Sequence, residues 1–103
     1  MPKVFRKQSL PPRARAAQQL FIVGDLLKKV IKKKYGKYVD VCELGKSEIA
    51  NATASKEGKG LKPVFVQVLK HFNVDRFYDS DFDYIFIVKD VNKPIITARR
   101  LKK

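Results

Sequence analysis

The sequence has few residues that stabilise a fold or catalyse a reaction by special chemistry. Its 103 residues include one cysteine and one histidine. The lone Cys42 excludes an internal disulfide and any zinc site made of cysteines alone, and it fits a reducing compartment. The lone His71 has no serine or cysteine nucleophile that spacing ties to it. We therefore expect a binding protein and not an enzyme.

Long apolar runs are also missing. No run approaches the ~20 residues that span a bilayer, and the basic residues 1–7 lead into no apolar region of the signal-peptide type. We expect an intracellular protein, in the cytoplasm or nucleus, with no membrane partner. Length and a hydrophobic content of 45% fit one domain with its own core. We place a basic arm over residues 1–12, the domain over 13–101 and a basic tail over 102–103.

Acidic residues are scarce, and the charge is uneven. The chain holds 23 Lys and Arg against 10 Asp and Glu, a net charge of +13. Residues 1–37 hold 11 basic residues and 1 acidic residue, and residues 93–103 hold 5 and 0. Residues 75–92 have the opposite balance, with 2 basic residues and 5 acidic residues. Positive charge concentrated at both ends attracts polyanions and releases the counterions condensed on nucleic acid.

The acidic residues gather in a predicted loop over residues 75–83. Asp79, Asp81 and Asp83, with Asp90 eleven residues after the first, have the alternation of a calcium loop. However, Tyr84 stands where that loop needs glycine, and a hydrophobic strand follows. We expect neither a metal nor a cofactor, and we interpret the loop as offsetting the basic ends or contacting a basic partner region.

The chain is organised around a long amphipathic helix predicted over residues 12–36. Pro11 and Pro12 provide a start signal, and Gly36 provides a stop signal. The apolar stripe that helical spacing predicts consists of Ala16, Leu20, Val23, Leu27, Val30 and Ile31. The opposite, polar side is predicted to carry Gln18, Asp25, Lys28, Lys29, Lys32 and Lys33.

Three residues interrupt this pattern. Phe21 falls at the edge of the stripe, and Ile22 falls on the polar side near Asp25 and Lys29. Ile22 is either a single exposed apolar residue or a contact with a partner or a second copy, so a homodimer is one alternative. Gly24, on the apolar side, indicates a close crossing by another element.

Shorter elements follow. Residues 38–44 predict a strand, and Ser47 is the predicted N-cap of a short helix over residues 48–54, with Ile49, Ala50 and Thr53 on one side. After a polar turn over residues 55–60, the apolar spacing within 61–73 favours a helix, although alternating valines leave a strand over 63–69 as the alternative. Residues 84–89 and 95–99 predict a hairpin, with Pro94 at an edge or strand-start position.

This order of elements resembles the winged-helix variant of the helix-turn-helix fold, an α+β class, over residues 13–101. The residues that carry the resemblance are Ser47-Glu48-Ile49-Ala50, opening the first short helix, and Val68-Leu69-Lys70-His71-Phe72, closing the next. The connection over residues 54–61 is longer than the family's tight turn, and the next helix is unusually apolar. Both departures argue against strong base reading.

The resemblance implies a DNA-binding protein whose third helix enters the major groove while the hairpin and termini contact the backbone. Gln67 is the best-suited neutral base reader, and the lysines mostly supply charge. The nucleic-acid-binding residues that follow are Lys46, Lys56, Lys59, Lys62, Gln67, Lys70, Lys93, Arg99 and Arg100, together with the N-terminal residues Arg6, Lys7, Arg13 and Arg15. We expect modest sequence specificity, as for a regulator or a genome-associated protein.

Two alternatives remain open on the sequence. If residues 63–69 form a strand, the chain is an α/β sandwich similar in element order to Alba-type proteins, and it would bind duplexes or RNA as a chromatin or ribonucleoprotein component. The other alternative is a protein-interaction module that uses the apolar face of the third helix, with the lysines keeping it soluble.

Overall fold

The structure, a computed structural model, describes residues 12–53 and 62–101, with the backbone alone at 62–64. The predictions made for residues 1–11, 54–61 and 102–103 lie outside this part of the chain. The elements are α1 (Arg13–Tyr35), β1 (Val41–Leu44), α2 (Lys46–Thr53), α3 (Lys62–His71), β2 (Arg76–Tyr78), β3 (Tyr84–Asp90) and β4 (Ile95–Arg100). The described residues thus form a small α+β domain of three helices and a four-stranded sheet.

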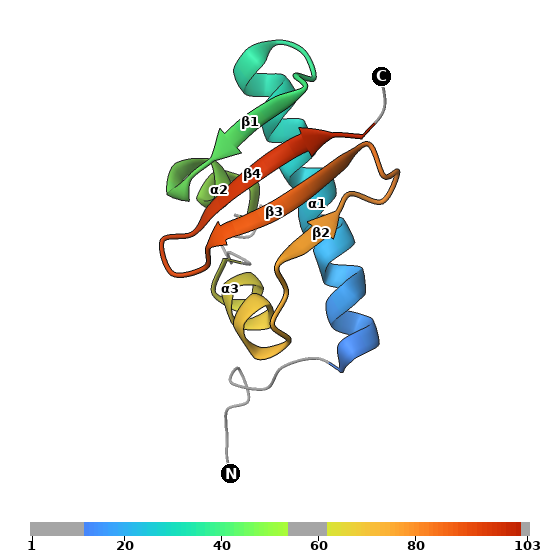
Figure 1. Cartoon of the computed structure of the whole chain (residues 1–103), viewed down its shortest axis with the longest axis vertical. Coiled ribbons are helices and arrows are strands. Elements are labelled where there is room, and N and C mark those ends of the chain that lie inside the picture. Colours follow the sequence, from blue (N-terminus) through green and yellow to red (C-terminus); the bar gives the residue numbers. More distant parts are fainter. Residues whose placement is uncertain (1–11, 54–61, 102–103) are drawn as a thin grey trace.

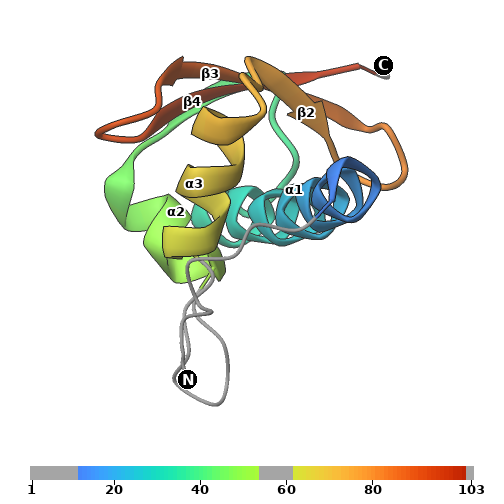
Figure 2. The same ribbon diagram turned by 90° about the horizontal axis from the view of Figure 1, so that it is seen from below.

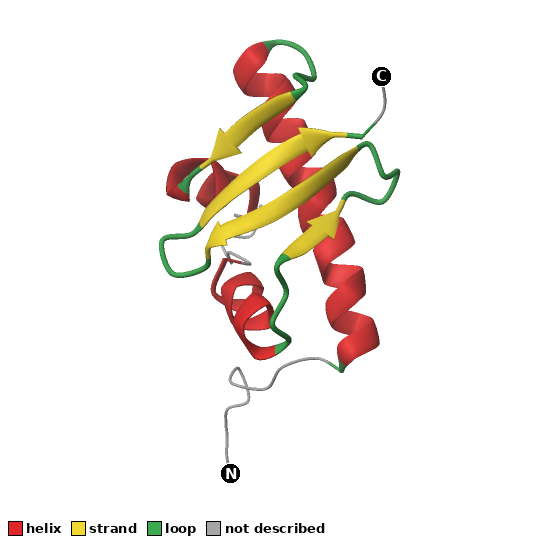
Figure 3. Ribbon diagram, viewed as in Figure 1, coloured by secondary structure: helices red, strands yellow, loops and turns green. Residues whose placement is uncertain are grey.

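The domain has two layers. The strands pair antiparallel in the order β1-β4-β3-β2, and the helices lie against one face of the sheet while the other face is open (Figures 1 and 2). In Figure 3, α1 passes behind the strands, and α3 lies at their lower edge. None of the described helices is long and apolar enough to cross a membrane.

The predicted long helix is confirmed at both ends. Pro12 has a φ of −59° and precedes the first turn, where its carbonyl accepts from the N–H of Ala16. Gly36 has a φ of 75°, the left-handed conformation of a helix C-cap, and its N–H donates to the carbonyl of Lys32 at 2.7 Å. Most of the predicted stripe is buried, and Val30 at its edge is half-buried.

The sheet register decides which strand residues enter the core. Phe77, Phe86 and Ala98 are aligned across β2, β3 and β4, and all three are buried beneath the helices. The rings of Phe77 and Phe86 are stacked at 5.2 Å, and Phe65 of α3 meets Phe77 edge-on at 5.5 Å. Because side chains alternate along a strand, Ile85, Ile87 and Thr97 point to the open face and are only half-buried.

α2 begins earlier than predicted, so the predicted role of Ser47 as its N-cap is wrong. The carbonyl of Gly45 accepts from the N–H of Ile49, and the side chain of Glu48 accepts from the N–H of Gly45 at 2.9 Å. This is the backward half of a capping box, with Gly45 as the cap. Ile49 and Thr53 are buried as predicted, and Ala50 is half-buried.

The segment after the polar turn is a helix, so the alternative strand over residues 63–69 is wrong. Phe65, Val68 and Leu69 are buried in helical spacing against the core, and helical burial outweighs the β preference of the valines. The predicted loop over 75–83 contains β2, a short edge strand paired with β3. The strand predicted over 38–44 is limited to Val41–Leu44.

Gly24 lies at a close crossing, as predicted. A Cβ built there would lie 2.5 Å from the carbonyl oxygen of Tyr78 and 2.8 Å from the backbone of Asp79. The chain leaving β2 therefore rests directly on the backbone of α1. This contact brings the acidic loop over Lys28, whose predicted place on the exposed polar side is wrong because the side chain is buried.

Candidate nucleic-acid interface

α3 exposes a narrow polar strip. Gln67, Lys70 and His71 are exposed, whereas the apolar side chains described on the same helix, within 65–69, pack in or against the core. The end of the helix is fixed by backbone hydrogen bonds, since the N–H of Asn73 donates to Lys70 and the N–H of Val74 donates to Leu69. Lys70 is therefore presented from a rigid helix end.

The β3–β4 hairpin presents a second group of cations beside this helix. At its tip the carboxylate of Asp90 accepts from the N–H groups of Asn92 at 2.9 Å and Lys93 at 3.3 Å. Pro94, next in the chain, is fully buried just before β4 begins, in accord with the predicted strand-start position. The turn is thereby held in one shape, with Lys93 exposed at its tip and Lys89 exposed near the end of β3.

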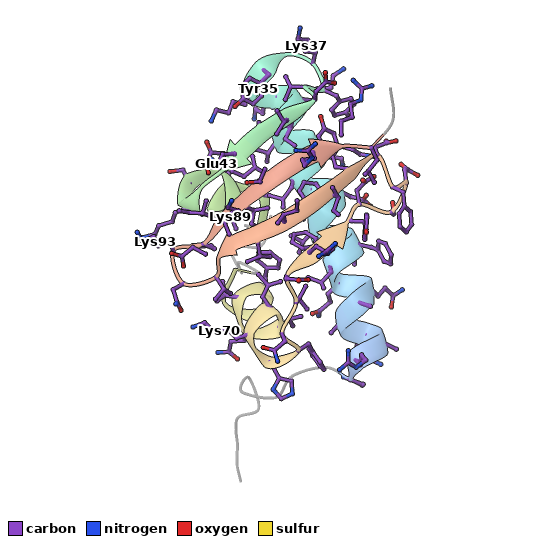
Figure 4. All side chains as sticks on the ribbon, viewed as in Figure 1. Tyr35, Lys37, Glu43, Lys70, Lys89 and Lys93 are labelled. Atoms are coloured by element: carbon purple, nitrogen blue, oxygen red, sulfur yellow. The ribbon has the colours of Figure 1, made fainter. Side chains whose placement is uncertain are left out.

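A surface hollow of about 430 Å³ lies between α3 and the hairpin. It is lined by Leu69, Lys70, Asn73, Val74, Asp75, Val88, Lys89 and Val91. Figure 4 shows Lys70, Lys89 and Lys93 along the same side of the molecule. None of these three lysines forms an ion pair with another residue in the described ranges, so their charges face solvent.

Two further predicted residues lie near this surface. Lys46 is exposed at the start of α2, and Leu44 just before it pairs with Ile96, at the hairpin end of the sheet (Figure 1). Arg13 is exposed at the start of α1, with its guanidinium 5.4 Å from the ring of Phe72, just beyond α3. Arg13 and the hairpin lysines thus lie beside α3, and Lys46 lies at the hairpin end of the sheet.

The other predicted residues are not brought to α3 by any described contact. Arg99 and Arg100 lie at the far end of β4, at the base of the hairpin, and the guanidinium of Arg100 donates to the carbonyl of Tyr38 at 3.2 Å. Arg15 is exposed on α1. Arg6, Lys7, Lys56 and Lys59 lie outside the described residues, and the side chain of Lys62 is not described.

Lys89 was missed by the sequence prediction. Lys89 was the last residue of the strand predicted over 84–89, and nothing in the sequence indicated that the hairpin approaches α3. The usable signal is its charge, since Lys89 is the only cation in the run from Tyr84 to Val91. A charged residue next to a hairpin turn belongs on an exposed side of the strand.

A different charge cluster lies on the other side of the domain. The ammonium of Lys28 contacts Asp79 at 2.9 Å, Asp83 at 3.0 Å and Asp81 at 3.3 Å. Asp79 is fully buried and also accepts from the N–H groups of Asp81 and Tyr84. Burial lowers the pKa of Lys28, but the hydrogen bonds that its ammonium donates to the three carboxylates raise the pKa by more, so the net shift is upward.

The cluster has the donor set of a cation site, and a lysine occupies it. Ligand oxygens of the three aspartates lie within 4.8 Å of one another, and Lys28 is within 3.3 Å of each residue. The acidic loop therefore contacts a basic group of its own chain. We name this arrangement, Lys28 with Asp79, Asp81 and Asp83, the lysine clamp.

Together these features define a small α+β domain with a cationic helix and hairpin on one side and, on the other, an acidic loop held by Lys28. No protein-family model, curated protein or solved structure matches the chain.

Proposed function

We propose that this protein binds duplex DNA with modest sequence specificity through α3 and the β3–β4 hairpin, in the manner of a winged helix-turn-helix domain. The observation that carries the proposal is the convergence of Lys70 and Lys89 on one hollow, with Lys93 beside them, in a chain of net charge +13. Three exposed ammonium groups on rigid elements form a surface that attracts phosphates.

The topology supports the winged-helix arrangement. The elements run in the order helix, strand, helix, helix, hairpin, with β1 beside β4 and β4 beside β3. β2 is an addition to that pattern and extends the sheet at the opposite edge from β1. α3 would then serve as the recognition helix and the β3–β4 hairpin as the wing.

The exposed residues also determine the kind of recognition. Gln67 is the exposed amide on α3 able to pair with a base edge, while Lys70, Lys89 and Lys93 supply charge. Phosphate contacts therefore outweigh base contacts, and affinity should fall steeply with salt. Each phosphate neutralised contributes about 0.9 to the slope of log affinity against log salt concentration.

The test is fluorescence anisotropy on a duplex too short for two copies, titrated across salt, beside duplex RNA and single strands. Lys70→Glu/Lys93→Glu should weaken DNA binding about tenfold or more and lower the salt slope by roughly 2. The control Lys33→Glu/Lys37→Glu makes the same change of charge on exposed lysines at the other end of the molecule, where Figure 4 shows Lys37.

The two double variants distinguish binding at a defined surface from binding driven by net charge. A loss confined to the Lys70/Lys93 variant supports the proposed surface. Equal losses in both double variants would mean that net charge alone drives binding, which contradicts a site at α3 and the hairpin. Preference for duplex RNA or single strands would contradict the choice of DNA.

A further inference from the structure

An aromatic patch lies beside the lysine clamp. Phe82 and Ile22 are 48% and 50% exposed, although both are large apolar residues. The ring of Phe82 lies 5.1 Å from that of Tyr78 and 5.7 Å from that of Phe21. Next to Phe21 is a hollow of about 180 Å³ between α1 and β2, lined mostly by apolar side chains and also by Arg76. We call Phe21, Ile22, Tyr78 and Phe82 the aromatic patch.

The backbone holds Phe82 in an unfavourable conformation. Its φ is 57°, a region that a residue with a bulky side chain seldom adopts. Two contacts with α1 hold the loop between β2 and β3 in place. The ammonium of Lys28 donates to the aspartates of the loop, and the N–H of Ser80 donates to the carboxylate of Asp25 at 2.8 Å. Backbone strain that the surrounding structure maintains is typical of functional positions. Here the strained conformation leaves the ring of Phe82 exposed to solvent.

Acidic side chains gather beside the patch, although the chain as a whole has a net charge of +13. Asp25, Asp79, Asp81 and Asp83 lie around it, and the ammonium of Lys28 contacts the last three. Asp81 is the most exposed of the clamp carboxylates. Such a surface repels nucleic acid and suits an apolar group flanked by cations.

The same chain carries that complementary surface. Tyr35, in the last turn of α1, is 42% exposed, and Lys33 and Lys37 beside it are exposed. Figure 4 shows Tyr35 and Lys37 together at one end of the molecule. The ammonium of Lys34 lies 5.5 Å from the Tyr35 ring and pairs with Glu48. We call Tyr35, Lys33 and Lys37 the basic end of α1.

The two surfaces cannot meet within one molecule. Phe21 and Tyr35 lie on the same straight helix, about 21 Å apart at 1.5 Å per residue. We propose that the basic end of α1 of one copy docks on the aromatic patch of a second copy, with Tyr35 against Phe82. Because the two surfaces differ, the contact is head-to-tail and can continue from copy to copy.

The proposal does not depend on DNA binding, and its test contains no nucleic acid. Sedimentation velocity at physiological salt, where repulsion between the basic molecules is screened beyond about 8 Å, should show mass rising with concentration. Phe82→Asn, which keeps a residue tolerant of positive φ, and Tyr35→Ser should each remain monomeric. A mixture of the two variants retains one complementary pair and should form dimers but nothing larger.

Controls keep the result interpretable. Leu101→Ser removes another exposed apolar side chain and should associate like the parent protein. Phe82→Gly removes the ring without backbone strain, and circular dichroism checks that every variant is folded. A monomeric parent protein would overturn the proposal, as would association of the Phe82 and Tyr35 variants. If both variants block association but their mixture stays monomeric, the contact is symmetric and the head-to-tail assignment is wrong.

Discussion

Lys28 and Lys93 are the same residue type in two regions of the molecule with opposite electrostatics. Lys28 is buried on α1 and touches three carboxylates. Lys93 is exposed at the tip of a hairpin, and its ammonium forms no ion pair with a residue in the described part of the chain. A charge removed from water needs partners within the fold, whereas an exposed charge remains available to a ligand.

The comparison separates stability from binding. The lysine clamp joins α1 to the loop between β2 and β3, so its removal should weaken the fold. The lysines around α3 should affect binding with little effect on folding. Substitutions in the two regions should therefore differ in their effect on the free energy of unfolding.

Lys28→Ala should have the largest effect. It leaves Asp79 fully buried without its ammonium partner, which should lower the free energy of unfolding by roughly 3–5 kcal/mol. Urea denaturation measures the change, with the exposed neighbour Lys29→Ala as the control. Equal effects of the two substitutions would mean that the clamp adds no specific stability.

Gly24→Ala tests the crossing beneath the clamp. The added Cβ would lie 2.5 Å from the carbonyl oxygen of Tyr78 and must push the loop away from α1. Overpacking of this kind costs about 1–3 kcal/mol despite the better helix propensity of alanine. Thermal unfolding followed by circular dichroism measures it. A stabilised variant would show that the contact is looser than described.

Glu48→Gln should have a smaller, pH-dependent effect. Hydrogen bonds from Lys34 and from the Gly45 N–H lower the pKa of Glu48 from its ordinary value of 4.5. Its contribution is therefore present above pH 4.5 and is lost as the pH falls through the lowered pKa. We expect a loss of about 0.5 kcal/mol at neutral pH, because a charge in the first helical turn is removed. The parent protein and the variant should converge in acid, and a constant difference would contradict this origin.

Lys89→Ala should leave unfolding unchanged, because the side chain is exposed and pairs with no other described residue. If the proposed DNA site is correct, the salt slope should fall by about 0.9. Chemical denaturation and the anisotropy titration make the two measurements on one sample. A large loss of stability with an unchanged salt slope would contradict the assignment of Lys89 to DNA binding.

Most helices and strands could be predicted from local patterns. The stripe from Ala16 to Ile31 and the proline and glycine signals define α1, because helix period and end conformations are properties of neighbouring residues. Gly24 even indicated a crossing. The edge strand β2 was missed because three residues carry little periodicity, and its pairing with β3 depends on the fold.

The candidate site was predictable in part. Lys70 and Lys93 follow from charge and element order, but Lys89 does not, since only the approach of the hairpin to α3 brings it to the same hollow. Arg100 shows the reverse case. Its charge predicts a phosphate contact, and the fold adds a hydrogen bond from its exposed guanidinium to the carbonyl of Tyr38, which no local pattern indicated.

The sequence by itself determined the long helix, the β3–β4 hairpin, the basic ends and the acidic segment, because these depend on composition and on spacing within short stretches. The tertiary structure alone decided which charges are neutralised. Asp79 and Lys28 are 51 residues apart, and they meet because the chain leaving β2 crosses α1 at Gly24, where no side chain keeps the backbones apart. Local sequence patterns do not indicate which segment crosses the helix. Here the crossing segment supplies the carboxylates that contact Lys28, whereas the lysines around α3 remain exposed.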